Sequence, residues 1–204
     1  IPWALERGVT LRTADAAVDA VLPEPLPGEI VAVLGSAQAA YDESKPWIPR
    51  EREWIRGLYA AGTAILGVCF GGQLLARSLG GAVARARKSE IGWTAIHSDD
   101  ASLIPSGPWF QFHYDSWTLP PGARELARNS AASQAFDYGR SLAVQFHPEL
   151  TPSGLEGWLN EGGREKVHDD GQDPDALLAH TRAEESAAEA RTIALLDAFL
   201  ERIA

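Results

Sequence analysis

Residues 64–73 read AILGVCFGGQ, and this stretch decides the fold class. The apolar run 64–68 is typical of a buried strand. It leads directly into Cys69, and residues 73–79 have the apolar spacing of a helix that ends at Gly80. A strand, a tight turn that carries a cysteine, and a helix together form the layout of a nucleophile elbow. The stretch therefore predicts an α/β fold with Cys69 at the end of a strand.

The residue types around Cys69 suit nucleophilic chemistry. Gly67 and Gly71 permit the tight backbone of such a turn. A helix that starts just after the cysteine points its N-terminus at the sulfur and favours the thiolate. The backbone amide of Phe70 is then placed to donate to an oxyanion. The alternative from this stretch alone is a buried cysteine in a glycine-rich turn, without chemistry.

A second motif follows another apolar run. Residues 142–146 read LAVQF, and His147 and Glu149 come directly after them. A cysteine nucleophile needs a base, and the base needs an acceptor that orients its ring. Side chains two residues apart in an extended segment point the same way, so Glu149 can hold the imidazole of His147. Alone, the motif is more typical of a surface turn. Because the carboxyl ends of parallel strands meet at one edge of a sheet, we expect it to lie beside Cys69.

The rest of the chain continues the alternation of strands and helices. We predict one α/β domain over residues 1–204, with residues 160–204 as a helical C-terminal extension. The further predicted segments are strands at 9–13 and 29–34 (the second buried), a loop at 36–49, a helix at 50–61, a strand-like and turn-rich middle at 82–112, a short helix at 155–159 and a long helix at 174–203 with room for one break.

Composition and charge exclude several classes of function. Of the 204 residues, 45% are hydrophobic and 23% are charged, which is the balance of a globular chain. The net charge of −10 argues against a nucleic-acid partner, and no apolar run is long enough to span a membrane. The basic cluster at 85–88 is read as a solvated strand edge, with a face toward a partner or a nucleotide-bearing substrate as the alternative. No cluster has the ligand spacing of a metal site, so we expect neither a metal nor a cofactor.

The two motifs, GVCFGGQ at 67–73 and QFHPE at 145–149, together resemble the class I glutamine amidotransferases of the Cys-His-Glu type. They are most similar to free-standing members that resemble the glutaminase part of GMP synthetase. The resemblance implies that Cys69 is the nucleophile, His147 the base and acid, and Glu149 the orienting carboxylate. It also implies that Gln73 contacts the substrate glutamine. The expected fold is a flavodoxin-like three-layer α/β/α arrangement around a mostly parallel sheet.

Two weaker matches concern substrate contacts. Gly35 and Ser36 occupy the place of a Gly-Gly-Pro turn, which in the family supplies the other oxyanion-hole amide. Serine adopts an unusual φ less readily than glycine, so an oxyanion hole at Ser36 requires some rearrangement. His113, Tyr114 and Asp115 resemble the family's His-Gly-Asp segment, whose backbone holds the α-amino and carboxylate groups of the substrate. Tyr114 in place of glycine is expected to narrow that pocket.

The reaction implied by the resemblance is hydrolysis of the side-chain amide of glutamine through a cysteinyl thioester, with ammonia passed to a separate synthetase subunit. The chain has no Gly-x-x-x-x-Gly-Lys loop of its own to cradle a phosphate. A second hypothesis is a γ-glutamyl peptidase that acts on a small γ-glutamyl conjugate, which the departures at Ser36 and Tyr114 leave open. A third is a non-catalytic binding or regulatory protein with the same fold.

The cysteine and methionine content bears on the cellular setting and the boundaries of the chain. The single cysteine excludes an intramolecular disulfide and fits a reducing, cytoplasmic setting. The sequence contains no methionine, and we expect that residue 1 is a cut, with the strand that precedes this segment in the family missing from the sequence.

Overall fold

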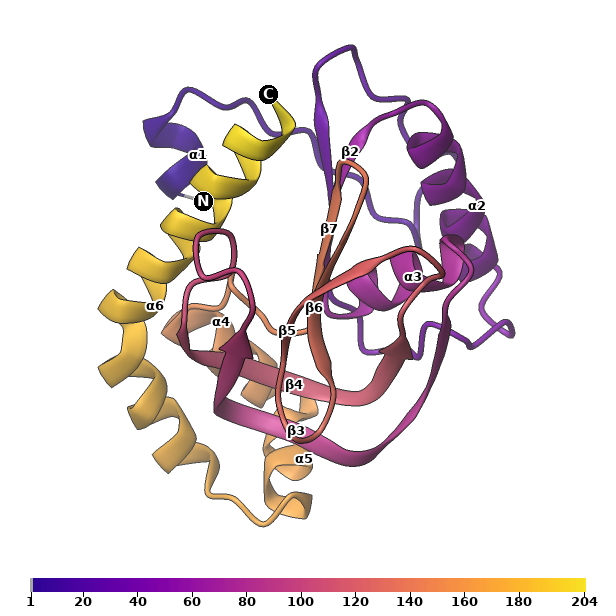
Figure 1. The fold of residues 1–204 in the computed structure, drawn as a ribbon. Coiled ribbons are helices and arrows are strands. Elements are labelled where there is room, and N and C mark those ends of the chain that lie inside the picture. The colour runs from indigo at the N-terminus through magenta and orange to yellow at the C-terminus, as the bar shows by residue number, and fades with distance from the viewer. Residues whose placement is uncertain (1) are drawn as a thin grey trace.

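The structure is a computed structural model that describes residues 2–204, and Figure 1 shows its fold. Over these residues one sheet is formed by the strands β1 (Ile30–Val33), β2 (Ala64–Val68), β3 (Ala82–Ser98), β4 (Gly107–Thr118), β5 (Arg124–Arg128), β6 (Ser133–Tyr138) and β7 (Ser141–Val144). Their order across the sheet is β1-β2-β7-β6-β5-β3-β4. The α/β class predicted from residues 64–73 is confirmed.

The sheet has a parallel half and an antiparallel half. β1 pairs with β2, and β2 with β7, in parallel. The pairs β7–β6, β6–β5, β5–β3 and β3–β4 are antiparallel. The expected parallel sheet is thus found only around β2, and the whole sheet is mixed. The reason is connection length, because the short turns from β5 to β6 and from β6 to β7 can join antiparallel neighbours only, whereas parallel neighbours need a long crossover.

Helices cover both faces of the parallel half (Figure 1). The helices are α1 (Pro2–Glu6), α2 (Trp47–Ala60), α3 (Phe70–Ser78), α4 (Pro152–Trp158), α5 (Arg164–Asp169) and α6 (Pro174–Ile203), with a kinked turn, η1 (Leu159–Gly163), between α4 and α5. The helices α2 and α3 lie on one face of β2, and the C-terminal part of α6 lies on the other. The flavodoxin-like three-layer description goes beyond these contacts and stays a prediction.

The alternation of side chains along β2 explains the two faces. Ile65 packs with Ile55 of α2 and Leu74 of α3. The next residue, Leu66, points the opposite way and packs with Leu195 of α6. All five residues of β2 are buried. The end of this strand is therefore held in place from both sides.

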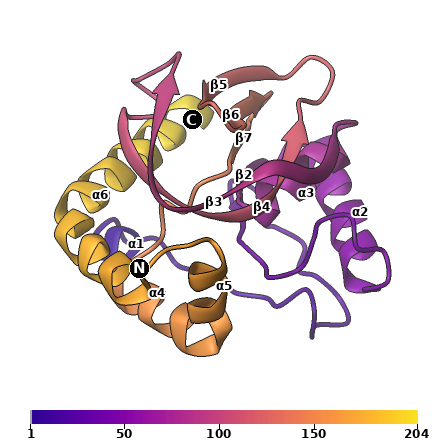
Figure 2. The same cartoon turned by 90° about the horizontal axis from the view of Figure 1, so that it is seen from below.

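A third hydrophobic cluster covers the far strands of the antiparallel half. Ile91 of β3 and Phe110 of β4 pack against Leu155 of α4, Val167 of α5 and Leu178 of α6. Figure 2 shows these three helices beside the curved β3–β4 pair. The C-terminal segment is thus part of the core around β3 and β4, in addition to covering β2.

Two of the predicted strands need correction. Residues 9–13 form no strand, and Val9 and Leu11 are 37% and 51% exposed. Without a neighbouring strand the backbone of such a segment has no ladder to join. The strand predicted at 29–34 exists as β1, but of its residues only Val33 is buried, because β1 is an edge strand that pairs with β2 alone. Ile30 and Leu34 are consequently exposed.

Several helix boundaries also differ from the prediction. α2 begins at Trp47, inside the predicted loop, because Pro49 falls in the first turn of the helix, where proline is tolerated. The short helix starts at Pro152, where Thr151 caps it by accepting from the Gly154 amide. α6 runs unbroken for 30 residues. The middle segment 82–112 is strand-rich as predicted, with the 17-residue strand β3, a turn and the start of β4.

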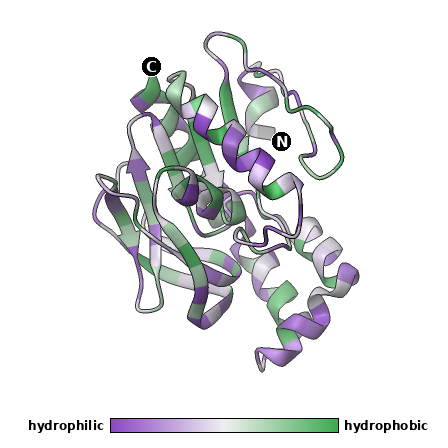
Figure 3. Cartoon of the chain, turned by 90° about the vertical axis from the view of Figure 1, so that its right-hand side faces the viewer, coloured by the Kyte–Doolittle hydropathy of each residue, from purple (hydrophilic) through white to green (hydrophobic). Residues whose placement is uncertain are grey.

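The helices carry both hydrophilic and hydrophobic residues along their length (Figure 3), as amphipathic helices that cover a sheet do. Among the helices described between residues 2 and 204, none combines the length and the apolar character that a membrane span requires.

Candidate active site

Cys69 lies on the turn between β2 and α3 with φ 51° and ψ −109°. It is the only non-glycine residue with a positive φ among residues 2–204. A conformation of this kind costs on the order of 1–3 kcal/mol and persists only where the surroundings hold it. Two backbone hydrogen bonds do so: Cys69 N donates to Val144 O at 2.8 Å, and Cys69 O accepts from Gln73 N at 2.9 Å. The predicted elbow is therefore present and strained.

The glycines of the elbow are required by close packing. A Cβ atom on Gly67 would lie 2.7 Å from Gly71 O. A Cβ atom on Gly71 would lie only 2.0 Å from the carbonyl oxygen of Val33 in β1. The start of α3 thus packs directly against the backbone of the two strands beside it, and no larger residue fits at either glycine.

The surroundings of the Cys69 sulfur can accommodate negative charge. Cys69 is 5% exposed and lies where α3 begins. The amides of the first helical residues, starting with Phe70, have no acceptor within the helix, and they carry the positive end of the helix dipole. The sulfur also accepts a hydrogen bond from Gln145 Nε2 at 3.6 Å.

His147 and Glu149 form a pair just beyond the end of β7. His147 Nδ1 donates to Glu149 Oε1 at 2.7 Å. The imidazole is almost buried and packs edge-on against the Trp158 ring, with the ring centroids 4.9 Å apart. The backbone amide of His147 donates to Phe110 O in β4 at 2.8 Å, which ties this segment to the antiparallel half.

Gly35 locates His147 relative to Cys69. A Cβ atom on Gly35 would lie 3.0 Å from His147 Cε1 and 3.9 Å from Cys69 Cβ, so the loop after β1 borders both side chains. Burial alone lowers the pKa of His147, but the charges of Cys69 and Glu149 and hydrogen bonding to both outweigh it. Together they raise the pKa of His147 from 6.5 to about 10. The protonated imidazolium is therefore the favoured form at neutral pH.

A cavity of about 610 Å³ opens above these residues. Its lining includes all ten residues singled out from the sequence, which are Gly35, Ser36, Cys69, Phe70, Gln73, His113, Tyr114, Asp115, His147 and Glu149. A larger hollow of about 980 Å³ lies elsewhere, lined by Leu26, Trp54 and Ile203 among others, and it contains none of the ten. The residues predicted from separate motifs are thus brought together at one cavity.

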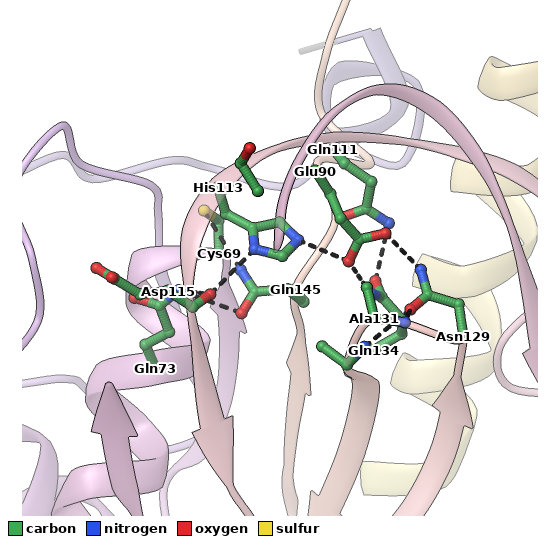
Figure 4. Close-up of polar contacts among 12 residues, drawn as sticks. Cys69, Gln73, Glu90, Gln111, His113, Asp115, Asn129, Ala131, Gln134 and Gln145 are labelled. Atoms are coloured by element: carbon green, nitrogen blue, oxygen red, sulfur yellow. Dashed lines mark hydrogen bonds and ion pairs between the residues drawn. The ribbon is translucent and has the colours of Figure 1, made fainter. Parts of the chain in front are cut away.

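Behind the cavity wall, a network of buried polar side chains connects Cys69 with β4 (Figure 4). Gln145 Nε2 contacts the sulfur, and Gln145 Oε1 accepts from Gln73 Nε2 at 3.2 Å. Gln73 Nε2 also lies 3.2 Å from the carbonyl oxygen of Asp115. Gln145 belongs to the QFHPE motif, but its side chain was given no role from sequence.

This network of polar side chains continues through His113 to Glu90 (Figure 4). Glu90 was given no role from the sequence. His113 Nδ1 donates to Asp115 O at 3.0 Å, and His113 Nε2 lies 3.2 Å from Glu90 Oε2, off the direction of a well-aligned hydrogen bond. Glu90 faces His113 from the neighbouring strand. The only sequence signal was an acidic residue beside an apolar run of β3.

The amide groups of Asn129 and Gln134 also donate to the Glu90 carboxylate. Burial would raise the pKa of Glu90, but His113 and the two amides hold it below its ordinary value. The side chains of Glu90 and His113 are 7% and 2% exposed, so a carboxylate and an imidazole meet in the interior next to the cavity.

Ser36 does not adopt the unusual φ that was considered for it from the sequence. Cys69 alone among the non-glycine residues of 2–204 has a positive φ, so Ser36 is not in the left-handed region. Its hydroxyl accepts from Gln38 N at 3.2 Å within the loop. Within the described part of the chain, no group of three His, Cys, Asp or Glu side chains could hold a metal ion.

Comparisons with known proteins identify relatives of this chain. The sequence pattern described as "Glutamine amidotransferase class-I" matches residues 39–159. The chain is 35% identical over 151 residues to a glutamine-hydrolyzing GMP synthase from Thermus thermophilus, an alignment that covers 68% of this chain and 29% of that protein. It is 33% identical over 168 residues to the corresponding protein from Aeropyrum pernix, covering 76% and 32% respectively. The chain thus spans about a third of the length of these relatives.

Solved structures give the same result. A glutamine amidotransferase from Thermotoga maritima superimposes with a TM-score of 0.85 at 28% identity, covering 98% of this chain and 89% of that one. A glutamine amidotransferase from Methylobacillus flagellatus also gives 0.85, over 98% and 87%, and at 21% identity it supports the fold alone. From the matched sequence pattern and these relatives, we conclude that the chain belongs to the class I glutamine amidotransferase family.

Proposed function

We propose that this protein hydrolyses the side-chain amide of glutamine through a thioester on Cys69, releasing glutamate and ammonia. One observation carries the proposal. A strained cysteine at a helix N-terminus shares a cavity with a histidine whose ring is oriented by a carboxylate. Nucleophile, base and orienting acid are the three parts that cysteine-based acyl transfer needs.

In the first step, the Cys69 thiolate attacks the carboxamide carbon while His147 is protonated, as its raised pKa favours. The tetrahedral intermediate then collapses with cleavage of the carbon–nitrogen bond. His147 donates its proton to the leaving nitrogen, so that ammonia departs and the thioester remains. Glu149 holds Nδ1 of the ring and thereby aims the other nitrogen at the reacting groups.

In the second step, a water molecule attacks the thioester carbon and gives a proton to the now neutral His147. The carbon–sulfur bond breaks, glutamate leaves, and the thiolate–imidazolium pair returns. Each step passes through an oxyanion. We assign its stabilisation to the amide of Phe70 and to the loop at Gly35 and Ser36, where one donor is worth about 3 kcal/mol.

We assign substrate contacts to Gln73, His113, Tyr114 and Asp115, which line the cavity beside Cys69.

The proposal includes a separate synthase subunit as acceptor of the ammonia, because the related GMP synthases are about three times as long as the part that matches this chain. It also treats residues 1–204 as a single glutaminase-like domain. A reducing compartment such as the cytoplasm would keep the single cysteine in its thiol form.

A glutamate-release assay tests the proposal. The unaltered chain should hydrolyse glutamine, and a glutamine-like electrophile should alkylate Cys69, which is the only cysteine in the sequence. Cys69→Ser should lose both properties. Hydrolysis that continues in Cys69→Ser would exclude the thioester, and a cysteine no more reactive than a free thiol would favour a non-catalytic binding protein.

A γ-glutamyl peptidase is the second candidate. It would use the same three residues, and the observation in its favour is the cavity volume of about 610 Å³, which lies in the range of sites for drug-sized ligands. Hydrolysis of γ-glutamyl dipeptides in preference to glutamine would support this activity.

A further inference from the structure

The wall of the cavity contains a large irregularity in the pairing of β3 with β4. Arg85 pairs with Asp115 and Glu90 pairs with His113, so that five steps along β3 correspond to two along β4. The residues between Arg85 and Glu90 therefore bulge out of the ladder. Bulges are frequent beside active sites because they redirect the side chains at their ends. Here one end carries the buried Glu90, and the other end carries Arg85.

The side chain of Arg85 is held by an aromatic contact, and its charge is not neutralised by an ion pair. Its guanidinium carbon lies 4.6 Å from the centroid of the Tyr114 ring, a cation–π contact. Among the described residues it forms no ion pair within 4 Å, in contrast to Arg77, Arg124 and Arg128. The contact therefore restrains the side chain and leaves its charge available. Tyr114 is the residue that replaces the glycine of the family motif, so the departure supplies the aromatic face on which Arg85 rests.

A second unpaired cation lines the same cavity. Lys166 of α5 reaches the cavity, and it forms no ion pair among residues 2–204. The acidic groups of the cavity are differently placed. Glu149 is bound to His147, and Asp115 accepts from Tyr41 Oη at 3.1 Å. Glu161 of η1 is exposed, as are Arg85 and Lys166, and it is the one acidic residue of the lining without a hydrogen bond or ion pair among residues 2–204. In a chain with a net charge of −10, two cations without ion-pair partners beside Cys69 and His147 are suited to an anionic ligand.

We propose that Arg85, supported by Tyr114, and Lys166 form a subsite that recognises a carboxylate of the substrate. This inference rests on the proposed hydrolysis at Cys69. The planar guanidinium can bind a carboxylate through two parallel hydrogen bonds, and the ammonium of Lys166 adds charge. The carboxylate has two possible sources, which are the α-carboxylate of the glutamyl group and a carboxylate on the leaving group of a γ-glutamyl conjugate.

Four substrates distinguish the sources. L-Glutamine is compared with its α-amide, and γ-glutamylalanine with γ-glutamylalaninamide, by measuring kcat and KM for each. If the subsite binds the α-carboxylate, the unaltered protein prefers glutamine over its α-amide, and Arg85→Ala removes that preference. If it binds the leaving group, the same loss appears within the dipeptide pair. In either case we expect Arg85→Ala to raise KM for the preferred substrate about tenfold with little change in kcat, since binding alone is lost.

Matched variants separate recognition from general damage. Tyr114→Ala should lose part of the preference, about threefold, because Arg85 is no longer held, whereas Tyr114→Phe should retain the preference. Arg87→Ala removes an exposed charge from the same strand outside the cavity lining and should leave all four substrates unaffected. If Arg85→Ala affects all four substrates equally, or none, the subsite is refuted while hydrolysis stands. If the unaltered protein hydrolyses none of the four, both proposals fall.

Discussion

The two halves of the sheet contribute differently to the site. In the parallel half, the ends of β1, β2 and β7 bring Gly35, Cys69 and the segment of His147 to one edge. In the antiparallel half, β3 and β4 form a bulged wall that carries Glu90, Arg85 and the segment 113–115. The comparison indicates that the groups proposed to react are placed by tight backbone geometry, whereas the wall proposed to recognise the substrate depends on cross-strand partners. Variants in each half should therefore fail in different ways.

The largest effect is expected at the reacting groups. His147→Ala should reduce glutamine hydrolysis by roughly 10⁴-fold, because the leaving nitrogen loses its proton donor and the nucleophile loses its partner. The denaturation midpoint should change little in comparison. If the variant keeps activity within tenfold of the unaltered protein, His147 is not the base, and the proposed role of its segment in the chemistry is contradicted.

The next effect concerns the packing of the elbow. Gly71→Ala places a Cβ atom 2.0 Å from a backbone oxygen of β1, and the backbone cannot give way as a flexible side chain would. We expect a loss of about 3 kcal/mol in the free energy of unfolding, measured by urea denaturation. Gly57→Ala in α2 is the matched control, since nothing lies within 4 Å of its Cβ position. That control should gain up to about 1 kcal/mol from helix propensity, and equal effects at both positions would contradict the packing argument.

In the antiparallel half, the buried pair can be broken by Glu90→Gln. The variant removes the carboxylate that faces His113 and sets an amide nitrogen against the donors of Asn129 or Gln134. We expect a loss of about 2 kcal/mol in stability, together with a raised KM for glutamine. Glu125→Gln removes a more exposed partner of Arg128 and should cost under about 1 kcal/mol. A loss of kcat at unchanged KM in Glu90→Gln would mean that the β3–β4 side of the cavity contributes to the chemical step and not only to substrate binding.

The smallest effect is a shift in pH dependence. Because the pKa of His147 is raised to about 10, its proton is retained through neutral pH, and hydrolysis should decline only as the pH approaches that value. Glu149→Gln removes a negative charge that raises this pKa. The alkaline limb of kcat/KM should then move to lower pH, by on the order of one unit. An alkaline limb that stays in place would mean that Glu149 does not set the charge of the ring.

Much of the parallel half could be predicted from local sequence. The segment 64–73 specifies a strand, a turn and a helix because its glycines, its apolar run and its helical spacing are all local signals. The shared edge of parallel strands then accounts for the meeting of Cys69 and His147. The failures arose because a local pattern does not show which strands will pair. The run at 9–13 has the pattern of a strand but no partner, and β1 has the composition of a buried strand but lies at the edge.

By itself, the sequence determined the elbow, the order of the two motifs and the family they resemble, because those features depend on neighbouring residues. Only the tertiary structure decided that Glu90 faces His113, that Arg85 rests on Tyr114 and that Gln145 reaches the sulfur. Each of these contacts joins residues on different elements. Their register depends on a bulge and on the packing of the whole sheet, and no local pattern of residues carries that information.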